Sequence, residues 1–231
     1  MKGALWRYSY VLNLSGETAS SIRFGNARQH GRIAWAVKRG LRLGVRVREA
    51  MNEEDLAAWY RLYLATMRRV VALPRPHHFF RELWSRMRPQ GMMKLLLAEQ
   101  AGAGGVRMLA GAVFLSYGST VHYAFAGCDA LAFDMRANDM LHWEAIHSVC
   151  KEGLRYYDFG EVVEQRPELA MFKRKWCAMP VPLYRYNYPA DDSRETDAAM
   201  EPMSRRWVRE IWQLMPLAMT RSCGNRIFGR L

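Results

Sequence analysis

The sequence predicts an α+β fold in which a mixed, mostly antiparallel central sheet is flanked by helices. The first observation is the order of apolar patterns from residue 41 onward: strand, two helices, three strands, helix, strand, helix and strand. The second is that short glycine-containing turns join the three middle strands, which favours antiparallel hairpins. The third is composition: 231 residues, 50% hydrophobic and 24% charged, suffice for a buried core and exclude a disordered chain.

Residues 1–40 predict a basic lead-in made of one strand and one helix. The stretch from Tyr8 to Leu14 has the apolar content of a short strand. Ser15-Gly16-Glu17 predicts a helix start, and the helix is expected to run to about Lys38 and to end at Gly40.

Residues 41–189 predict one domain, and its first strand carries a basic row. Apolar and polar residues alternate from Leu41 to Arg48, so Arg42, Arg46 and Arg48 are expected to share one face. This row suits the phosphates of a donor or of a nucleotide-linked acceptor. It equally suits a charged sheet edge that discourages strand pairing, and both interpretations stay open.

The other elements of this domain follow from periodicity and from Pro and Gly breaks. They are helices over 52–69 and 79–87, strands over 93–98, 106–116 and 120–126, a helix over 136–153, a strand over 155–159, a helix over 168–176 and a strand over 181–188. The glycine cluster at 101–105 leads into a strand, whereas a phosphate-binding loop leads into a helix, so a hairpin is predicted.

Residues 190–203 predict a polar linker, and residues 204–231 predict an amphipathic helix and tail. The apolar face of that helix is expected to dock on the domain, or alternatively on an anionic membrane surface. No apolar run approaches the ~18 residues of a membrane span. The chain is therefore expected to be cytoplasmic, and at most peripheral to the inner face of the membrane. Its oligomeric state is left open.

The net charge of +12 is concentrated at the two ends of the chain. Residues 1–50 hold ten Lys and Arg against two Glu, which favours phosphorylated, nucleic-acid or anionic-membrane partners. The four cysteines are widely spaced and the histidines show no metal-ligand spacing, so neither disulfides nor a metal site is expected.

Four segments in register resemble the C-terminal GNAT-like domain of FemA/FemB-type aminoacyltransferases, in particular FemAB-like proteins found with exosortase and exopolysaccharide systems. They are Asn138–Ile146, Tyr157–Gly160, Met171–Trp176 and Pro182–Tyr186. The resemblance runs from about Tyr8 to the C-terminus and implies a sheet that splays between its fourth and fifth strands, where donor and acceptor meet. Family members usually carry a preceding GNAT-like half, which is expected to lie outside this chain.

The resemblance implies an N-acyltransferase that moves an aminoacyl or acyl group to an amine of a peptidoglycan or polysaccharide precursor. The donor would be an aminoacyl-tRNA or an acyl-CoA, with no tightly bound cofactor. Residues 128–138 lack the glycine-rich pyrophosphate loop of acetyl-CoA users, which counts against acetyl-CoA. Two alternatives remain: an acetyl-CoA-dependent GNAT acetyltransferase, and a non-catalytic basic module that binds RNA or an acidic partner.

Lys173 and Asp158 are the expected catalytic residues. The resemblance places Lys173 where FemAB-like enzymes have a lysine near the reacting carbonyl or a phosphate, although Lys173 and Arg174 could also belong to a solvated basic face. Asp158 and Glu161 follow the fifth strand, where a carboxylate could accept the amine proton or orient the acceptor. An Asp followed by Phe-Gly also often caps a turn.

The expected substrate-binding side chains are Phe172, Tyr123, Glu161, His142 and Arg174. Phe172 would form a wall, or else belong to the core. His122 and Tyr123 are expected to face opposite sides of the fourth strand, and the Tyr123 hydroxyl is the better candidate for the cleft. His142 falls on the apolar face of its helix, where a histidine with a satisfied hydrogen bond is the commoner outcome.

Overall fold

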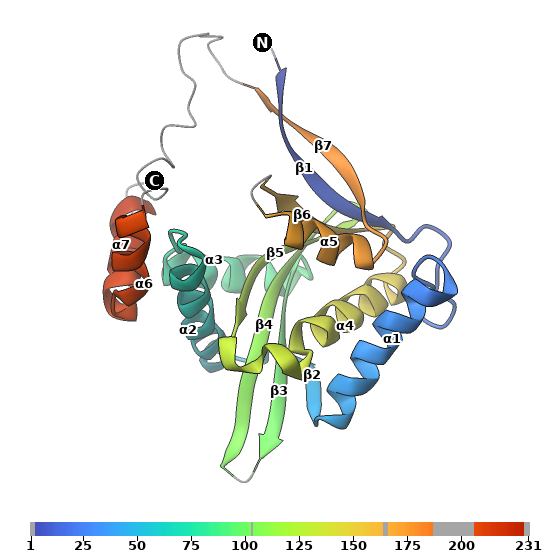
Figure 1. The fold of residues 1–231 in the computed structure, drawn as a ribbon, viewed down its shortest axis with the longest axis horizontal. Coiled ribbons are helices and arrows are strands. Elements are labelled where there is room, and N and C mark those ends of the chain that lie inside the picture. The colour runs from blue at the N-terminus through green and yellow to red at the C-terminus, as the bar shows by residue number, and fades with distance from the viewer. Residues whose placement is uncertain (1–2, 103, 164–165, 187–205, 229–231) are drawn as a thin grey trace.

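The computed structural model describes residues 3–102, 104–163, 166–186 and 206–228, which include one seven-stranded sheet with helices on both faces (Figure 1). The strand order is β2-β3-β4-β5-β6-β1-β7. The strands are β1 Gly3–Asn13, β2 Val45–Glu49, β3 Met93–Gly102, β4 Gly105–Tyr117, β5 Thr120–Cys128, β6 Tyr156–Val162 and β7 Met179–Tyr186. The predicted α+β class with a mostly antiparallel sheet is confirmed.

Two apolar cores lie on opposite faces of this sheet. The helices are α1 Ala27–Arg42, α2 Glu53–Val70, α3 His77–Arg86, α4 Ala137–Lys151, α5 Pro167–Lys175, α6 Arg206–Leu214 and α7 Leu217–Phe228, with short 3-10 helices η1 Arg88–Gln90 and η2 Ala130–Met135. Helices α1 and α4 cover one face, and α2 and α3 cover the other. Buried Trp59 ties α2 to β4 through an indole N–H that donates to Gly111 O at 2.9 Å.

The parallel pair β5–β6 is the exception in the sheet, because all other neighbours are antiparallel. It joins only three residue pairs, from Thr120–Tyr156 to His122–Asp158. Within the described strands no pair follows, so β5 and β6 part after His122 and Asp158. This is the predicted splay between the fourth and fifth strands counted from residue 41.

The first helix begins later and ends later than predicted. The predicted start at Ser15-Gly16-Glu17 is wrong, because the chain turns there and α1 begins only after Asn26. The Asn26 side chain accepts from Gln29 N at 3.0 Å, and the Gln29 side chain accepts from Asn26 N at 3.0 Å, which is a capping box. The predicted end at Gly40 is also wrong, because a Cβ there would lie 2.8 Å from Met140 of α4. Gly40 therefore serves the close approach of α1 and α4 inside a continuous helix.

The predicted strand from Leu41 to Arg48 is correspondingly too long. Its first two residues belong to α1, and β2 begins only at Val45, after Gly44 with a φ of +79°. The predicted domain boundary at residue 41 falls inside α1. Strand β1 is longer than predicted and pairs with both β6 and β7, so the lead-in shares the sheet of the following domain.

The C-terminal segment forms two helices where one was predicted. Pro216 does not end the structure, because its carbonyl accepts from Thr220 N at 3.1 Å at the start of α7. Both helices contact α2, and Arg68 donates to Met215 O at 3.0 Å. Trp212 is buried while Leu214 is exposed, so the Trp212 side of α6 docks on the domain. The predicted linker at 190–203 lies outside the described residues.

None of the described helices is long and apolar enough to cross a membrane.

Candidate active site

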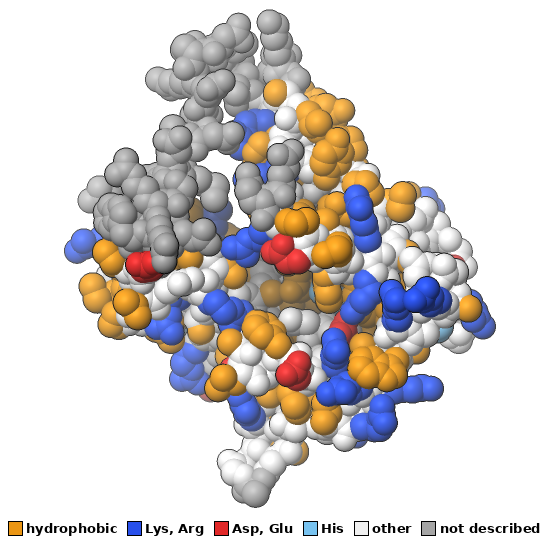
Figure 2. Space-filling view, viewed as in Figure 1, with side chains coloured by type: hydrophobic (Ala, Val, Ile, Leu, Met, Phe, Trp, Pro, Cys, Tyr) orange, Lys and Arg blue, Asp and Glu red, His pale blue; other side chains and the backbone are white. Residues whose placement is uncertain are grey.

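An aromatic cluster fills the side of the splay that faces α4. The His142 ring of α4 lies at its centre, with ring centroids 4.7 Å from Tyr123, 4.9 Å from Phe159, 5.4 Å from Phe172 and 5.8 Å from Trp176. The rings around His142 come from β5, β6, α5 and the residue that follows α5. The space-filling view shows this face of the molecule hollowed near its middle, with hydrophobic side chains visible inside (Figure 2).

Lys173 of α5 is buried beside the splay and is held by the backbone of β6. Its Nζ donates to Gly160 O at 2.8 Å and to Glu161 O at 2.9 Å. These carbonyls belong to a bulge in the β1–β6 ladder between Ser9 and Val11, where Gly160 has a φ of +79°. An ammonium group has three donors, so one N–H of Lys173 is left for a substrate.

The surroundings of Lys173 bring its pKa down to about 8. Burial lowers the pKa of the ammonium group, and the nearby carboxylates of Asp158 and Glu161 partly offset this effect. Lys173 therefore carries its charge at neutral pH and loses it slightly above. It is the one buried lysine among the described residues, which sets it apart from a solvated basic face.

Asp158 forms hydrogen bonds at the last residue pair of β5 and β6, where the two strands part. Its Oδ1 accepts from Gly160 N at 2.7 Å and from the Ser9 hydroxyl, and its Oδ2 lies 3.1 Å from His122 Nδ1. Burial alone would raise the pKa of Asp158, but the hydrogen bonds from His122, Ser9 and Gly160 lower it overall. Asp158 is thus an ionised carboxylate that caps the turn, as one sequence interpretation held, and also orients His122.

His122 is a site residue that the sequence prediction did not favour. Its ring is 45% exposed, and its Nδ1 side faces Asp158, so the other ring nitrogen is free to act on a substrate. The sequence gives only a weak signal for this role of His122. The contact with Asp158 depends on the pairing of two parallel strands that lie far apart in the chain.

Tyr123 and His142 take different roles within the cluster. Tyr123 lies on the α4 side, opposite to His122, as predicted. Burial raises the pKa of its phenol, and no hydrogen bond joins the hydroxyl to another group in the described part of the chain. The His142 Nδ1 lies 2.7 Å from the Tyr157 hydroxyl, and burial lowers the pKa of its ring to about 3. His142 is accordingly a neutral core histidine that packs behind the pocket.

Two predicted substrate-binding residues point elsewhere. Glu161 is exposed and forms an ion pair with Arg7 across the β1–β6 ladder. Arg174 is exposed, with its guanidinium carbon 5.9 Å from the centre of the Tyr10 ring. The structure therefore brings together Lys173, Asp158, Tyr123, Phe172 and His142 at the splay, and leaves the side chains of these two outside it.

The predicted basic row is dispersed. Arg42 ends α1, and Arg46 donates to Leu41 O and Val45 O at 3.3 and 3.0 Å. Arg48 pairs with Asp55 and Glu99 at 2.7 and 2.8 Å, which raises its pKa further and occupies its guanidinium. The three arginines thus form no common phosphate-binding face. Positive charge gathers instead along the α1 and α4 side of the view in Figure 2.

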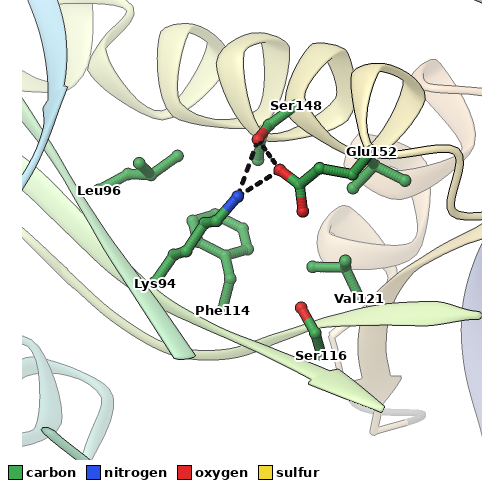
Figure 3. Close-up of a pocket in the computed structure, with 9 residues that line it drawn as sticks. Lys94, Leu96, Phe114, Ser116, Val121, Ser148 and Glu152 are labelled. Carbon is green, nitrogen blue, oxygen red and sulfur yellow. Dashed lines mark hydrogen bonds and ion pairs between the residues drawn. The ribbon is translucent and has the colours of Figure 1, made fainter. Parts of the chain in front are cut away.

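The cavity shown in Figure 3 is too small for a substrate. It lies between the sheet and α4, with a volume of about 20 Å³, which is room for one water molecule. Lys94 reaches Ser148 Oγ at 3.2 Å and forms an ion pair with Glu152 beside it. Among the described residues no group of three His, Cys, Asp or Glu side chains could hold a metal ion.

The segment before α4 does not form a glycine cradle for a pyrophosphate. It folds into η2, where the Asp129 carboxylate accepts from Leu131 N at 2.9 Å and pairs with Arg107. The Asp129 carboxylate at the start of this segment disfavours a bound phosphate, whereas the basic side chains of Arg136 and Lys175 lie near the start of α4.

Comparison with known proteins identifies the fold and its family. Residues 27–174 match the family described as acetyltransferase (GNAT) domain, and no curated protein sequence matches. The structure of FemX is similar with a TM-score of 0.65 at 14% identity, over 77% of this chain and 60% of that one. The C-terminal domain of a putative lysylphosphatidylglycerol synthetase from Agrobacterium fabrum gives 0.52 at 10%, over 79% and 60%. L-PGS from Bacillus licheniformis gives 0.56 at 9%, over 89% and 67%.

At these identities the likeness shows the shared fold, and the chain spans about 60% of the length of FemX. The matched family covers more than half of the chain and includes both strands of the splay, α4 and Lys173. The chain therefore belongs to the acetyltransferase (GNAT) domain family and shares the fold of FemX and of L-PGS.

Proposed function

We propose that this protein is an acyltransferase that moves an aminoacyl or acyl group onto an amine of a cell-envelope precursor, and that the transfer takes place at the β5–β6 splay. The observation that carries the proposal is Lys173, a buried ammonium group that two carbonyls of the Gly160 bulge hold beside the opening. Such a charge is costly to bury without a task or a partner.

Lys173 would stabilise the oxyanion of the transfer. When the amine attacks the donor carbonyl, the C–N bond forms and the carbonyl oxygen gains negative charge. The third N–H of Lys173 can donate to that oxygen, in a setting where water is largely excluded. When the carbonyl reforms, the bond to the leaving oxygen or sulfur breaks. The Tyr123 hydroxyl, which burial keeps protonated, would give its proton to that leaving atom and regain one from solvent.

His122 would accept the proton that the attacking amine must lose. Its free ring nitrogen can take that proton, and the Asp158 carboxylate stabilises the imidazolium that results. His122 and Tyr123 stand on opposite faces of β5 at the point where the strands part. Donor and acceptor would thus enter the splay from opposite faces of the sheet.

The structural neighbours support one type of substrate. The similar domain from Agrobacterium fabrum belongs to a putative lysylphosphatidylglycerol synthetase, a name that refers to an aminoacylated membrane lipid. FemX agrees with the FemA/FemB-type resemblance of this sequence. These likenesses support an aminoacyl donor such as aminoacyl-tRNA. The family description supports an acetyl-CoA donor as the second candidate. A non-catalytic basic module is no longer favoured, because the chain belongs to an enzyme family.

We place the enzyme in the cytoplasm, with contact to the inner face of the membrane through α6. Ile211 and Leu214 of this helix are exposed while Trp212 docks inward. Exposed apolar residues on a basic chain favour an anionic lipid surface. Co-sedimentation with vesicles of anionic phospholipid measures this contact.

The first experiment identifies the reaction. The protein is incubated with charged tRNA, acetyl-CoA and a pool of envelope precursors, and mass spectrometry identifies which acceptor gains mass and by how much. An aminoacyl increment on an amine supports the proposal. An acetyl increment selects the second candidate, and no increment with any donor contradicts both.

The second experiment tests Lys173. Lys173→Ala is expected to lower kcat by about 10²-fold, the scale for one lost oxyanion donor. Lys151→Ala, at the exposed end of α4, is the matched control and keeps full activity. Circular dichroism establishes that the variant is folded. A folded Lys173→Ala protein with unchanged kcat would remove Lys173 from the reaction.

A further inference from the structure

A basic groove lies beside the splay, on the surface formed by α1 and the start of α4. It has a volume of about 400 Å³. Its lining comes from α1, from the residue that precedes α4 and from the end of α5, and is made of Arg28, Gly31, Arg32, Trp35, Ala36, Arg136 and Lys175. No residue of this groove belongs to the candidate active site described above.

The positive charge of the groove is largely uncompensated. Arg28 and Arg32 form neither hydrogen bonds nor ion pairs within the described part of the chain. Asp139 is the acidic residue that meets the lining, and its Oδ1 pairs with Lys175. Its Oδ2 forms a long ion pair with Arg136 at 3.9 Å, and Arg136 Nε is buried with no hydrogen-bond partner among the described residues. The guanidinium groups of Arg28 and Arg32 are thus left to bind an anion, and Arg136, which shares Asp139 with Lys175, lies beside them.

Trp35 adds an aromatic surface to this charge. Its side chain is 48% exposed, an unusual position for a tryptophan in a helix that packs on the core. The guanidinium carbons of Arg39 and Arg136 lie 5.5 and 5.4 Å from the ring centre. An exposed aromatic ring among arginines is the arrangement that stacks a base while cations hold its phosphate.

Lys175 connects the groove to the splay. Its Nζ lines the groove and lies 4.8 Å from the ring centre of Phe172 and 5.5 Å from that of Trp176, both in the aromatic cluster. Its charge also lowers the pKa of His142. A ligand in the groove is therefore close enough to extend a reactive group into the splay.

We propose that this groove binds the nucleotide part of the acyl donor, with the base on Trp35 and phosphate oxygens on Arg28, Arg32 and Arg136. The inference rests on the proposed function and specifies it, because both candidate donors carry a phosphorylated adenosine: at the 3′ end of tRNA and in coenzyme A. Side chains of α1 would then bind the phosphate groups, because the segment before α4 has no glycine-rich loop that could bind them.

Equilibrium binding of nucleotides tests the groove without any need for transfer. Titration calorimetry measures the Kd of AMP, of 3′,5′-ADP and of an RNA oligonucleotide that ends in CCA, with adenosine and inorganic phosphate as partial probes. We expect nucleotides to bind more tightly than either partial probe. Tighter binding of the RNA end points to a tRNA donor, and tighter binding of 3′,5′-ADP points to coenzyme A.

Two substitutions distinguish the contribution of base stacking to nucleotide binding from that of the phosphate contacts. Trp35→Ala is expected to weaken nucleotide binding about tenfold while leaving the affinity for inorganic phosphate unchanged, because only stacking is lost. Arg32→Gln is expected to weaken both by a similar factor. Lys151→Gln is the matched control: it removes one charge at the far end of α4, about 20 Å from Arg136, and keeps the wild-type Kd. Both groove residues are exposed, so the variants fold.

The result that overturns the inference is the same nucleotide Kd in wild type, Trp35→Ala and Arg32→Gln, or no nucleotide binding at millimolar concentration. This outcome differs from a failure of the proposed function. If the wild-type protein transfers an acyl group and both groove variants do so with unchanged KM for the donor, the groove assignment is wrong and the enzyme assignment stands. If the wild-type protein binds nucleotide, both groove variants bind it more weakly and no acyl transfer is detected, the groove assignment stands and the enzyme assignment is wrong.

Discussion

At the scale of single residues, burial and local hydrogen bonds decide which charged side chains can act. Lys173 and Arg174 are neighbours in sequence, yet Lys173 is buried on the carbonyls of β6 while Arg174 is exposed. Asp158 and Glu161 differ in the same way, because Asp158 orients His122 while Glu161 pairs with Arg7. Of each pair of like-charged residues, the structure therefore places one at the splay: Lys173 as a candidate catalytic residue and Asp158 as the residue that orients His122.

The pH dependence of the reaction follows from Lys173. Its folded pKa of about 8 lies below the ordinary 10.5, so the side chain loses its charge as the pH rises through 8. If the ammonium group stabilises the oxyanion, kcat/KM is expected to fall above pH 8. Lys173→Arg keeps the cation, so this alkaline decline should move to higher pH. The measurement is kcat/KM between pH 6 and 10 for both proteins.

Unfolding does not account for such a decline. Because the pKa of Lys173 is lowered on folding, the unfolded chain binds more protons than the folded chain between about pH 8 and 10.5. This group therefore makes the folded protein more stable as the pH rises through that window. An alkaline decline that persists unchanged in Lys173→Arg would assign it to another group.

His122 is expected to act as the proton acceptor, so His122→Gln should lower kcat by about 10²-fold or more. Glutamine can still donate to Asp158, which keeps the local hydrogen bond while removing the basic nitrogen. His78→Gln, on the exposed side of α3, is the control and should keep full activity. Wild-type kcat in a folded His122→Gln protein would exclude this role.

At the scale of elements, close packing explains what periodicity alone did not show. Gly40 was expected to end a helix and instead lets α1 approach Met140 of α4. Leu41 and Arg42 alternate like a strand but continue α1, because the chain turns only at Gly44. Alternation of apolar and polar residues over a few positions predicts a strand. The residue at which a helix ends also depends on the elements that it packs against, and a local pattern does not show these.

The packing of α2 on β5 depends on Gly127, which we expect to tolerate no side chain. A Cβ there would lie 2.5 Å from Tyr63 N and 2.7 Å from Leu62 C, both backbone atoms. Gly127→Ala must separate the helix from the sheet and is expected to lower the free energy of unfolding by about 3 kcal/mol.

The matched control for Gly127→Ala is Gly31→Ala on α1. A Cβ at Gly31 meets no atom within 4 Å, so alanine should stabilise the helix by about 0.5–1 kcal/mol. Urea denaturation measures both. Equal stabilities for the two variants would mean that α2 is not packed against β5 as described.

At the scale of the whole molecule, the C-terminal helices complete the face that carries α2. Trp212 and Thr220 are buried, and a Cβ on Gly224 of α7 would lie 2.4 Å from Pro74 O. These contacts join residues far apart in the sequence. The amphipathic pattern of 204–215 predicted a docking helix, and its buried Trp212 face meets the protein rather than a lipid surface.

Trp212 is therefore expected to contribute to folding stability. Trp212→Ala should lower the free energy of unfolding by about 3 kcal/mol, because a large buried side chain leaves a cavity. Ile211→Ala, at a side chain that is 55% exposed, should change it by no more than about 0.5 kcal/mol. Urea denaturation distinguishes the two; if Trp212→Ala left stability intact and abolished vesicle binding, this face of α6 would belong to a membrane contact.

The sequence by itself determined the α+β class, the order of the central elements, the FemAB-like resemblance and Lys173 as the leading candidate. These depend on local periodicity and on short segments whose residue types are visible in one dimension. Only the tertiary structure decided that His122 meets Asp158, that Arg48 is occupied by carboxylates, and that Arg28, Trp35, Arg136 and Lys175 line one groove. Strand register and helix packing set these contacts, and both join residues whose separation along the chain carries no signal of their meeting.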